Sequence, residues 1–497
     1  MVLLEGTIIM NVMQPISFGP PRRQNHLFSP TEDTSFSFAT VFTCIVVFII
    51  FSRFSELVSI LFRTGVPLVL IFGGLALVAV IIDGRLLLGF DSVQGKTLIA
   101  FTIWMILAGI FGVWRGGSYG VITSIWLKSL TIFFMVVGST RNKKDLRWVM
   151  VALAAAAAFV VFQSYVFGTG DAERGAVSFQ GSTTMTFSNA NGLALSLVVG
   201  LPFVLFFAMN AQTMLIRIAC YGILAIGSFA LLKTGSRGGL LALGVILLLI
   251  FLRVSVIQKF LMLLFVTLFL TAGISILPRS ATERFRSILG VVQSEEAFSA
   301  DESRKTRAKL FFESVLMTAQ HPLLGVGPGN FLFEAAKDAE ESGRRSNWVE
   351  SHNCYTKVSS ETGVPGLLMF GTVMFLSIWR IRGLYRTATK LGNLYWANLS
   401  FCTYLSFCAY ALFSTFDNGA YLYGLPLLSG LVVSILAVAK RDMSRQSPNA
   451  RSIPNPLVNR FANPVVGSGS RQKVVSPGSL GSKWNGRTTA VPQLPRN

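Results

Sequence analysis

Long apolar stretches alternate with short polar turns along most of this chain. Because lipid offers no hydrogen-bond partner to the backbone, each stretch is predicted to be a helix. Several are shorter than the ~20 residues that cross a hydrocarbon core. The pattern predicts an all-α polytopic membrane protein with about 12 transmembrane helices. The stretches lie at about residues 37–52, 66–82, 97–113, 119–139, 148–168, 191–209, 214–232, 238–252, 256–277, 364–379, 396–413 and 421–439.

Polar segments divide the chain into five predicted parts. Residues 1–36 form a cytoplasmic N-terminal segment without the pattern of a cleaved signal peptide. Residues 37–277 hold helices one to nine, and residues 364–439 hold helices ten to twelve. Between them, residues 278–363 form one long periplasmic loop with room for short helices. Residues 440–497 are rich in Pro, Ser and Gly, which predicts a disordered cytoplasmic tail.

Composition narrows the class of protein further. The chain is 52% hydrophobic and only 13% charged, whereas soluble proteins average about 25% charged residues. These values exclude a soluble enzyme and a disordered regulator. The five cysteines are scattered and form no Cys-x-x-Cys pair, so neither a disulfide framework nor a cysteine zinc site is expected.

The net charge of +20 does not indicate nucleic acid, because of where the charges lie. The basic turns at 141–147 and 380–390 and the tail at 440–497 fall on one side of the predicted helices. Under the positive-inside rule that side is cytoplasmic. Arg53 and Arg63 count against this orientation but are outnumbered. The expected partners are therefore a lipid bilayer and its components.

A tight turn separates the seventh and eighth predicted helices. Residues 233–239 read Lys-Thr-Gly-Ser-Arg-Gly-Gly, which places Ser236 and Arg237 at the membrane surface beside a helix N-terminus. A guanidinium, free backbone N–H groups and a helix dipole together form an anion site. An arginine that merely reaches the interface beside turn glycines would give the same pattern.

The long loop contains a candidate amphipathic helix. Arg304 and Arg307 precede an apolar face formed by residues 308, 311, 312, 315 and 316. The pattern predicts a helix that lies in the membrane interface with its cations near lipid phosphates. Ordinary lipid anchoring remains the alternative.

Two further loop segments carry histidines. Residues 321–331 hold three glycines and two prolines, so His321 is interpreted as a turn residue. Further along, His352 stands beside Asn353 and ahead of Glu361. A neutral imidazole near the membrane can accept a hydroxyl proton at neutral pH, although it can also serve as a structural hydrogen-bond partner.

One charge lies inside a predicted span. Lys128 is a functional candidate because intramembrane charges are costly, unless it is paired or reaches the interface. The sequence lacks a phosphate-binding loop, a His-Glu-x-x-His motif and an Asp-x-Asp pair. No metal site and no cofactor are expected.

The order of these motifs resembles the O-antigen ligase and polymerase superfamily. The similarity spans about residues 185–375, and it also includes a Phe-Ser-Asn-Ala-Asn-Gly-Leu-Ala segment at 187–194. The resemblance implies a GT-C-like membrane glycosyltransferase, metal-independent and inverting, in the bacterial inner membrane. Its donor would be a glycan on a polyprenyl diphosphate such as undecaprenyl diphosphate. Its acceptor would be a hydroxyl of lipid A–core or another glycan.

The resemblance also implies roles for particular residues. Arg237 and Arg307, with Arg304 as the second choice for the loop arginine, would hold the diphosphate, and His352 would act as base. The side chains expected to support substrate binding are Ser236, Asn353, Glu361 and Lys128. Two arginines could stabilise the leaving group's charge in place of a metal ion. Phe311 stands where tryptophan is common in the family, which leaves the acceptor open.

Three alternatives remain at this stage. A polymerase of the same superfamily would use the same donor to extend a glycan. A transporter or flippase of lipid-linked sugars would concentrate charged or broken helices at the membrane midplane. A non-catalytic lipid-binding scaffold would make His352 dispensable.

Overall fold

The structure is a computed structural model that describes residues 37–446, with gaps at 64–65, 167–168, 171–176, 179–189, 277–294, 342 and 344–349. The chain forms two compact units, Met1–Arg445 and Gln446–Asn497, and the architecture below concerns the first. The predicted N-terminal segment, and the predicted tail beyond residue 446, lie outside the described residues.

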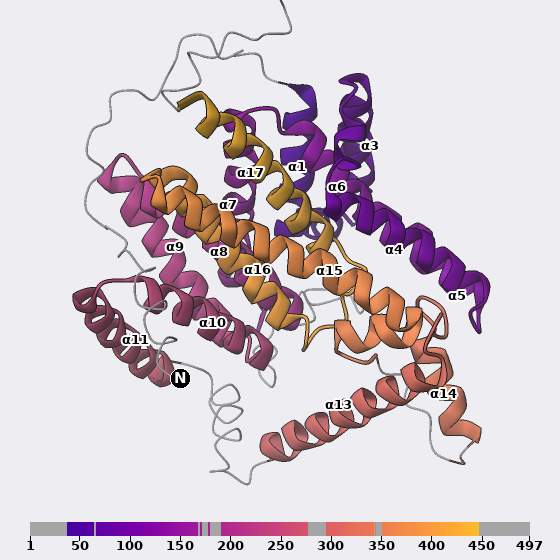
Figure 1. The fold of residues 1–497 in the computed structure, drawn as a ribbon. Helices are drawn as coiled ribbons and strands as arrows, with labels where there is room; N and C mark the ends of the chain where they lie inside the picture. Colours follow the sequence, from indigo (N-terminus) through magenta and orange to yellow (C-terminus); the bar gives the residue numbers. More distant parts are fainter. Residues whose placement is uncertain are drawn as a thin grey trace, which may run out of the picture. The chain divides into compact units, whose positions relative to one another are not determined.

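The described part of the chain is almost entirely helical (Figure 1). One pair of two-residue strands, β1 (Thr169–Gly170) and β2 (Val177–Ser178), is antiparallel. The helices are α1 (Phe38–Ser52), α2 (Phe54–Phe62), α3 (Leu68–Ile82), η1 (Leu86–Gly89), α4 (Val93–Ile110), α5 (Arg115–Val121), the π-helical turn η2 (Ile122–Trp126), α6 (Leu127–Ser139), α7 (Lys143–Val166), α8 (Ala190–Asn210), α9 (Met214–Lys233), α10 (Arg237–Arg253), α11 (Val256–Ile276), α13 (Glu295–Gln320), α14 (Phe331–Glu341), α15 (Cys354–Lys390), α16 (Leu394–Phe413) and α17 (Gly424–Gln446).

The predicted helical class is confirmed, and each of the twelve predicted apolar stretches overlaps a helix. Within the described residues, seven helices are long and apolar enough to cross a membrane. The full count of about twelve spans stays a prediction. The seven are Val93–Ile110, Arg115–Ser139, Lys143–Val166, Asn191–Asn210, Met214–Lys233, Cys354–Lys390 and Gly424–Ser444.

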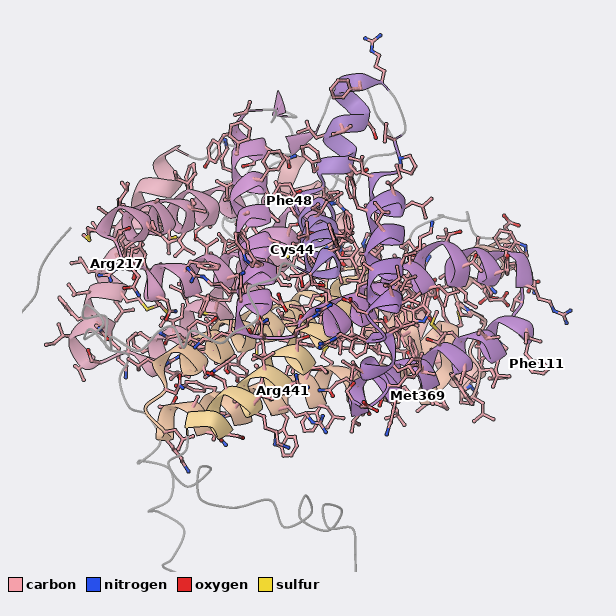
Figure 2. All side chains as sticks on the ribbon, turned by 90° about the horizontal axis from the view of Figure 1, so that it is seen from above. Cys44, Phe48, Phe111, Arg217, Met369 and Arg441 are labelled. Atoms are coloured by element: carbon pink, nitrogen blue, oxygen red, sulfur yellow. The ribbon has the colours of Figure 1, made fainter. Side chains whose placement is uncertain are left out.

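Apolar side chains cover much of the outside of this helical unit. Phe111, Phe260 and Phe375 are all more than 60% exposed, and Figure 2 shows Phe111 projecting outward at the end of α4. A water-soluble protein rarely exposes apolar patches of this extent. The exposed faces therefore fit contact with lipid, as the composition predicted.

The core combines large aromatic side chains with satisfied polar groups. Trp126 is fully buried, packs edge-on against Phe101 at 5.1 Å between ring centroids, and donates from Nε1 to Thr102 Oγ1 at 2.8 Å. In lipid as in water, a buried indole N–H needs such an acceptor. The contact fixes η2 against α4.

One predicted boundary is wrong, and one helical segment was not predicted. Helix α15 starts at Cys354, where Asn353 caps it, but it is interrupted at the non-helical Gly363, so its apolar part begins at residue 364 as predicted. The basic stretch at 380–390, predicted to be a loop, forms the C-terminal turns of α15. Arginine and lysine are good helix formers, and their long side chains can carry the charges outward from a continuing helix.

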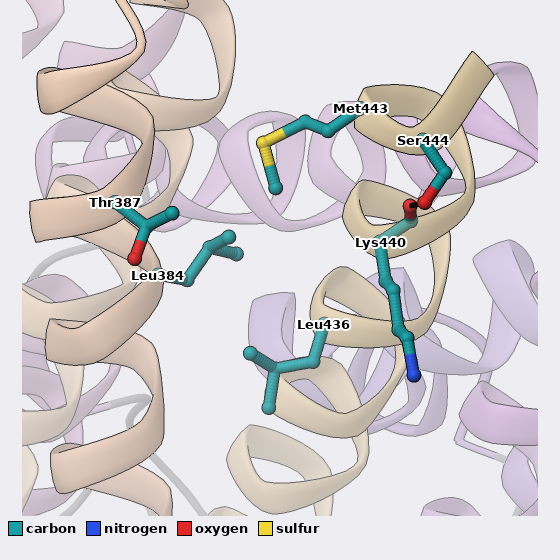
Figure 3. Close-up of a pocket in the computed structure, with 6 residues that line it drawn as sticks. All are labelled: Leu384, Thr387, Leu436, Lys440, Met443 and Ser444. Atoms are coloured by element: carbon teal, nitrogen blue, oxygen red, sulfur yellow. Dashed lines mark hydrogen bonds between the residues drawn. The ribbon is translucent and has the colours of Figure 1, made fainter. Parts of the chain in front are cut away.

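A groove of about 450 Å³ at the C-terminal end of α15, lined partly by Leu384 and Lys440, includes none of the predicted site residues (Figure 3).

Candidate active site

The turn between α9 and α10 is built by a helix cap. Helix α10 begins at Arg237, and Ser236 Oγ accepts the Gly239 N–H at 3.2 Å. The same hydroxyl donates to Asn191 Oδ1 of α8 at 2.8 Å. Ser236, predicted to bind substrate, thus has its hydroxyl engaged in holding the turn.

The two glycines after Arg237 allow a very close approach of helix α8 and of the turn after α16. A Cβ on Gly238 would lie 2.8 Å from the Cβ of Phe416, and one on Gly239 would lie 2.9 Å from that of Ala194. Any side chain would push α10 away from these neighbours. The Gly-Gly pair therefore fixes the backbone position from which the Arg237 side chain extends.

Helix α13 carries Arg307 and presents two different faces. Leu310 and Met317 are buried, whereas Phe312 and Leu316 are 70% and 59% exposed. Thr318 Oγ1 and Ser359 Oγ lie 2.9 Å apart, which joins α13 to α15. The exposed apolar face agrees with the predicted face, and its place in a membrane interface stays a prediction. Arg307 is half-buried, while the Arg304 side chain lies outside the described residues.

Helix α15 is broken at Gly363, whose φ of 71° lies in the region that favours glycine. A Cβ there would lie 2.0 Å from the carbonyl oxygen of Leu323. Two residues later, Pro365 has no N–H to donate. The break therefore releases backbone carbonyls from their normal helical partners.

The glycine-rich loop at 321–330 and helix α4 supply the missing donors. Val326 N–H donates to Ser360 O and Gly327 N–H to Glu361 O, both at 2.9 Å. Trp104 Nε1 of α4 donates to Thr362 O at 2.8 Å. Every carbonyl named here is satisfied by a group from another segment, so the break is a fixed part of the fold. His321, at the start of this loop, is exposed.

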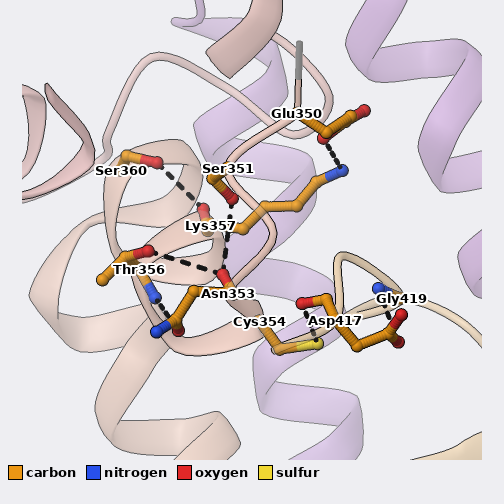
Figure 4. Close-up of polar contacts among 9 residues, drawn as sticks. All are labelled: Glu350, Ser351, Asn353, Cys354, Thr356, Lys357, Ser360, Asp417 and Gly419. Carbon is orange, nitrogen blue, oxygen red and sulfur yellow. Dashed lines mark hydrogen bonds and ion pairs between the residues drawn. The ribbon is translucent and has the colours of Figure 1, made fainter. Parts of the chain in front are cut away.

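The histidine segment leads directly into α15. His352 has a φ of 50°, and Asn353 then caps the helix by accepting the N–H groups of Tyr355 and Thr356 at 2.9 and 3.2 Å. Figure 4 shows Asn353 and Thr356 together with the ion pair of Lys357 and Glu350, whose Nζ and Oε2 atoms are 2.6 Å apart. The ion pair ties the residues before His352 to the helix after it. Asn353 is thus placed as a helix cap.

Buried polar groups surround the start of α15 next to this segment. Cys354 donates from its backbone N–H to Ser414 O at 2.9 Å and from Sγ to Asp417 O at 3.2 Å. Burial raises the pKa of the Asp417 carboxyl above its ordinary value. Glu361 is 1% exposed and interacts electrostatically with Lys357. Glu361 therefore belongs to the buried support of α15.

Electrostatics show which predicted residues lie near one another. Burial, and then the charge of Arg307, lowers the pKa of His352, and Lys357 adds to this effect while Glu350 opposes it. Burial, and then the charge of Arg237, lowers the pKa of Arg307. The fold thus brings Arg237, Arg307 and His352 together from α10, α13 and the start of α15.

Within the described residues, neither Arg237 nor Arg307 forms an ion pair with a carboxylate. Two neighbouring guanidinium groups repel each other, and a bound anion relieves that repulsion. A lowered pKa keeps the nearby imidazole neutral at physiological pH. Chemically, the cluster can hold an anionic group next to a base.

The remaining predicted residue, Lys128, lies on α6 two residues after the π-helical turn, and its side chain is exposed. No contact in the described residues connects it to the cluster. The described residues also contain no group of three or more His, Cys, Asp and Glu side chains arranged to hold a metal ion. Independence from metal stays a prediction.

Sequence reasoning missed the residues that support the cluster. Trp104 and Glu350 contact the site from distant or irregular segments, and no local motif marks them. Asn191 lies in the 187–194 segment noted above, but its bond to Ser236 was not predicted. Lys357 had a usable signal, since it precedes Glu361 by four residues at a helix start.

Fold and cluster together define a polytopic helical membrane protein with two arginines beside an imidazole. Residues 222–371 match the family model described as O-antigen ligase, which confirms the resemblance to the O-antigen ligase superfamily. The matched segment, less than a third of the chain, includes Arg237, Arg307 and His352. It supports a membrane enzyme of the ligase and polymerase type. No curated protein matches the sequence.

Proposed function

We propose that this protein is a membrane glycosyltransferase that moves a glycan from a polyprenyl-diphosphate carrier to an acceptor hydroxyl. The observation that carries the proposal is the cluster of Arg237, Arg307 and His352, in which two arginines without carboxylate partners in the described residues lie near a neutral imidazole. The family match over the same segment supports it. The reaction would take place at the periplasmic face of the bacterial inner membrane, with lipid A–core or a growing glycan as acceptor.

In the proposed mechanism, the two arginines bind the diphosphate and His352 accepts the proton of the acceptor hydroxyl. The resulting oxygen nucleophile attacks the anomeric carbon, forming the new glycosidic bond with inversion. The bond to the diphosphate oxygen breaks, and its electron pair stays on the departing polyprenyl diphosphate. Guanidinium groups stabilise this growing negative charge because their planar fork matches phosphate oxygens.

The lowered pKa of His352 suits this role. A base must be unprotonated before it acts, and burial together with the nearby arginine disfavours the protonated imidazole. The arginine that would bind the donor therefore also keeps the base in its active form. The two functions of the cluster support each other.

Glycan transfer by the purified protein tests the proposal. In detergent with a polyprenyl-diphosphate glycan and lipid A–core, we expect a glycosylated acceptor, with activity unchanged by EDTA. Activity lost in EDTA and restored by Mg²⁺ or Mn²⁺ would contradict a metal-independent mechanism. Absence of transfer to any hydroxyl acceptor, together with movement of the donor across vesicles, would favour the flippase alternative.

Complementation separates the two enzyme types. A ligase should restore glycan attachment in a ligase-null strain, whereas a polymerase should restore long chains in a polymerase-null strain, both visible on gels. For orientation, a cysteine placed at Ser342, which lies outside the described residues, should react with an impermeant label from the periplasmic side. Labelling that requires permeabilised membranes would overturn the proposed topology.

A further inference from the structure

An apolar groove runs between α7, α9 and α11 on the outside of the helical unit. Its volume is about 670 Å³, within the ~300–1,000 Å³ typical of small-molecule sites. Phe162, Val166 and Ile226 are each about half exposed although they are apolar. The lining residues are Ala158, Val161, Phe162, Tyr165, Val166, Ala225, Ile226, Phe229 and Phe269.

The groove has one polar end. Lys233, the last residue of α9, has its ammonium 5.2 Å from the centre of the Tyr165 ring, near the C-terminal end of α7. Ala225, Phe229 and Lys233 are spaced four residues apart, so they lie along one face of α9. Following that face leads from an apolar surface to a cation and a phenol, which are side chains suited to lipid headgroups.

That polar end adjoins the candidate active site. Only the three-residue turn separates Lys233 from Arg237, and four residues of chain span at most about 14 Å. A diphosphate held by Arg237 would therefore lie close to the groove's polar end. Its hydrocarbon chain needs an apolar path out of that position.

We propose that this groove holds the first part of the donor's polyprenyl chain, with Lys233 at the junction of chain and diphosphate. The inference rests on the proposed function, which supplies the identity of the donor. It adds a binding site for the lipid chain on α7, α9 and α11, apart from the residues that would carry out the reaction. Binding of the chain there would orient the diphosphate toward Arg237 and Arg307. An ordinary membrane phospholipid in the groove is the competing outcome.

Photo-crosslinking locates the chain directly. The protein in phosphatidylethanolamine and phosphatidylglycerol nanodiscs is irradiated with a long-chain polyprenyl diphosphate that carries a diazirine near its diphosphate end. We expect adducts at residues 158–166 and 225–229 that unlabelled polyprenyl diphosphate removes. Adducts on α13 instead, or adducts that the competitor leaves unchanged, would overturn the proposal.

A filled groove gives a second test. Ala225→Trp should raise the Kd for long-chain polyprenyl diphosphate at least tenfold and leave the Kd for a two-isoprene analogue nearly unchanged. Gly244→Trp on α10 is the matched control, because a side chain there meets nothing within 4 Å. Unchanged long-chain affinity in Ala225→Trp, or equal losses for both ligands, would contradict the groove.

The two proposals can fail separately. Binding and crosslinking do not require glycan transfer, so a protein that binds the chain in the groove but transfers no glycan would refute the proposed function alone. A protein that transfers glycan while Ala225→Trp binds the long chain normally would refute the groove alone.

Discussion

Two groups of cations in this molecule differ in what surrounds them. Near the start of α7, Arg141 pairs with Asp83, and Lys143 lies 3.7 Å from Asp442 and 4.2 Å from the centre of the Tyr395 ring. Arg237 and Arg307 instead lie near each other, without a carboxylate partner in the described residues. The first group is satisfied by the protein itself. The second is arranged for an anion that the described residues do not provide.

The largest effect is expected at the base beside the second group. His352→Ala should lower turnover by about 10²–10⁴-fold, the usual contribution of a general base, while donor affinity changes little. The measurement is single-turnover transfer in detergent together with equilibrium donor binding. His321→Ala, at an exposed turn position, is the matched control and should retain activity. A larger loss in His321→Ala than in His352→Ala would mean that the roles of the two histidines are reversed.

Removing either arginine of the second group should lower both donor binding and rate. Arg237→Ala and Arg307→Ala should each reduce the rate by about 10²–10³-fold, as loss of one transition-state donor does elsewhere. Lysine at either position should restore activity only in part, because it lacks the planar fork. Arg141→Ala, from the paired group, serves as control and should leave donor affinity unchanged. An equal loss of donor affinity in all three variants would contradict the proposed difference between the two groups of cations.

The pH profile sharpens the comparison further. His352 has a pKa below its ordinary value of 6.5, so the acidic limb of kcat/KM should lie below that pH. Removing the Arg307 charge should raise the pKa and move the limb toward higher pH. Replacing Glu350 by Gln should move it the other way, since the Glu350 charge raises the pKa. A limb that stays in place in both variants would show that another group titrates.

The smallest effect concerns the helix cap next to the base. Asn353→Ala should lower the free energy of unfolding by about 1 kcal/mol, because two N–H groups lose their acceptor. Asn353→Ser should retain most of the stability, and thermal unfolding in detergent measures both. Full stability but lost donor binding in Asn353→Ala would assign this residue to the substrate instead.

The sequence predicted the helices well because their signal is local. A stretch such as 214–232 is apolar over most of its length, with Arg217 as its one charge, and the structure begins and ends α9 within one residue of it. The polar first part of α15, Cys354 through Thr362, was not predicted to be helical because it lacks an apolar pattern. Polar residues at a buried helix start form hydrogen bonds and ion pairs with residues distant in the sequence, which a local pattern does not show.

The residues of the candidate site could be chosen from the sequence by their chemistry, but the contacts that hold them in place could not. Arg237, Arg307 and His352 stand out as charged or ionisable side chains in irregular or amphipathic segments. The bond from Trp104 to Thr362, by contrast, joins positions 258 residues apart. Likewise, nothing near Gly363 in the sequence indicates that Leu323 will press against it. Such contacts depend on tertiary packing, which periodicity and spacing do not specify.

A double-mutant cycle on donor binding tests the central claim, that Arg237 and Arg307 hold one diphosphate between them. Binding of polyprenyl diphosphate is measured by calorimetry in detergent for the wild type, Arg237→Ala, Arg307→Ala and the double variant. Residues that share one ligand group are expected to be non-additive. We expect each single variant to bind at least tenfold more weakly and the double variant to lose less affinity than the product of the two factors. Wild-type affinity in either single variant would contradict it.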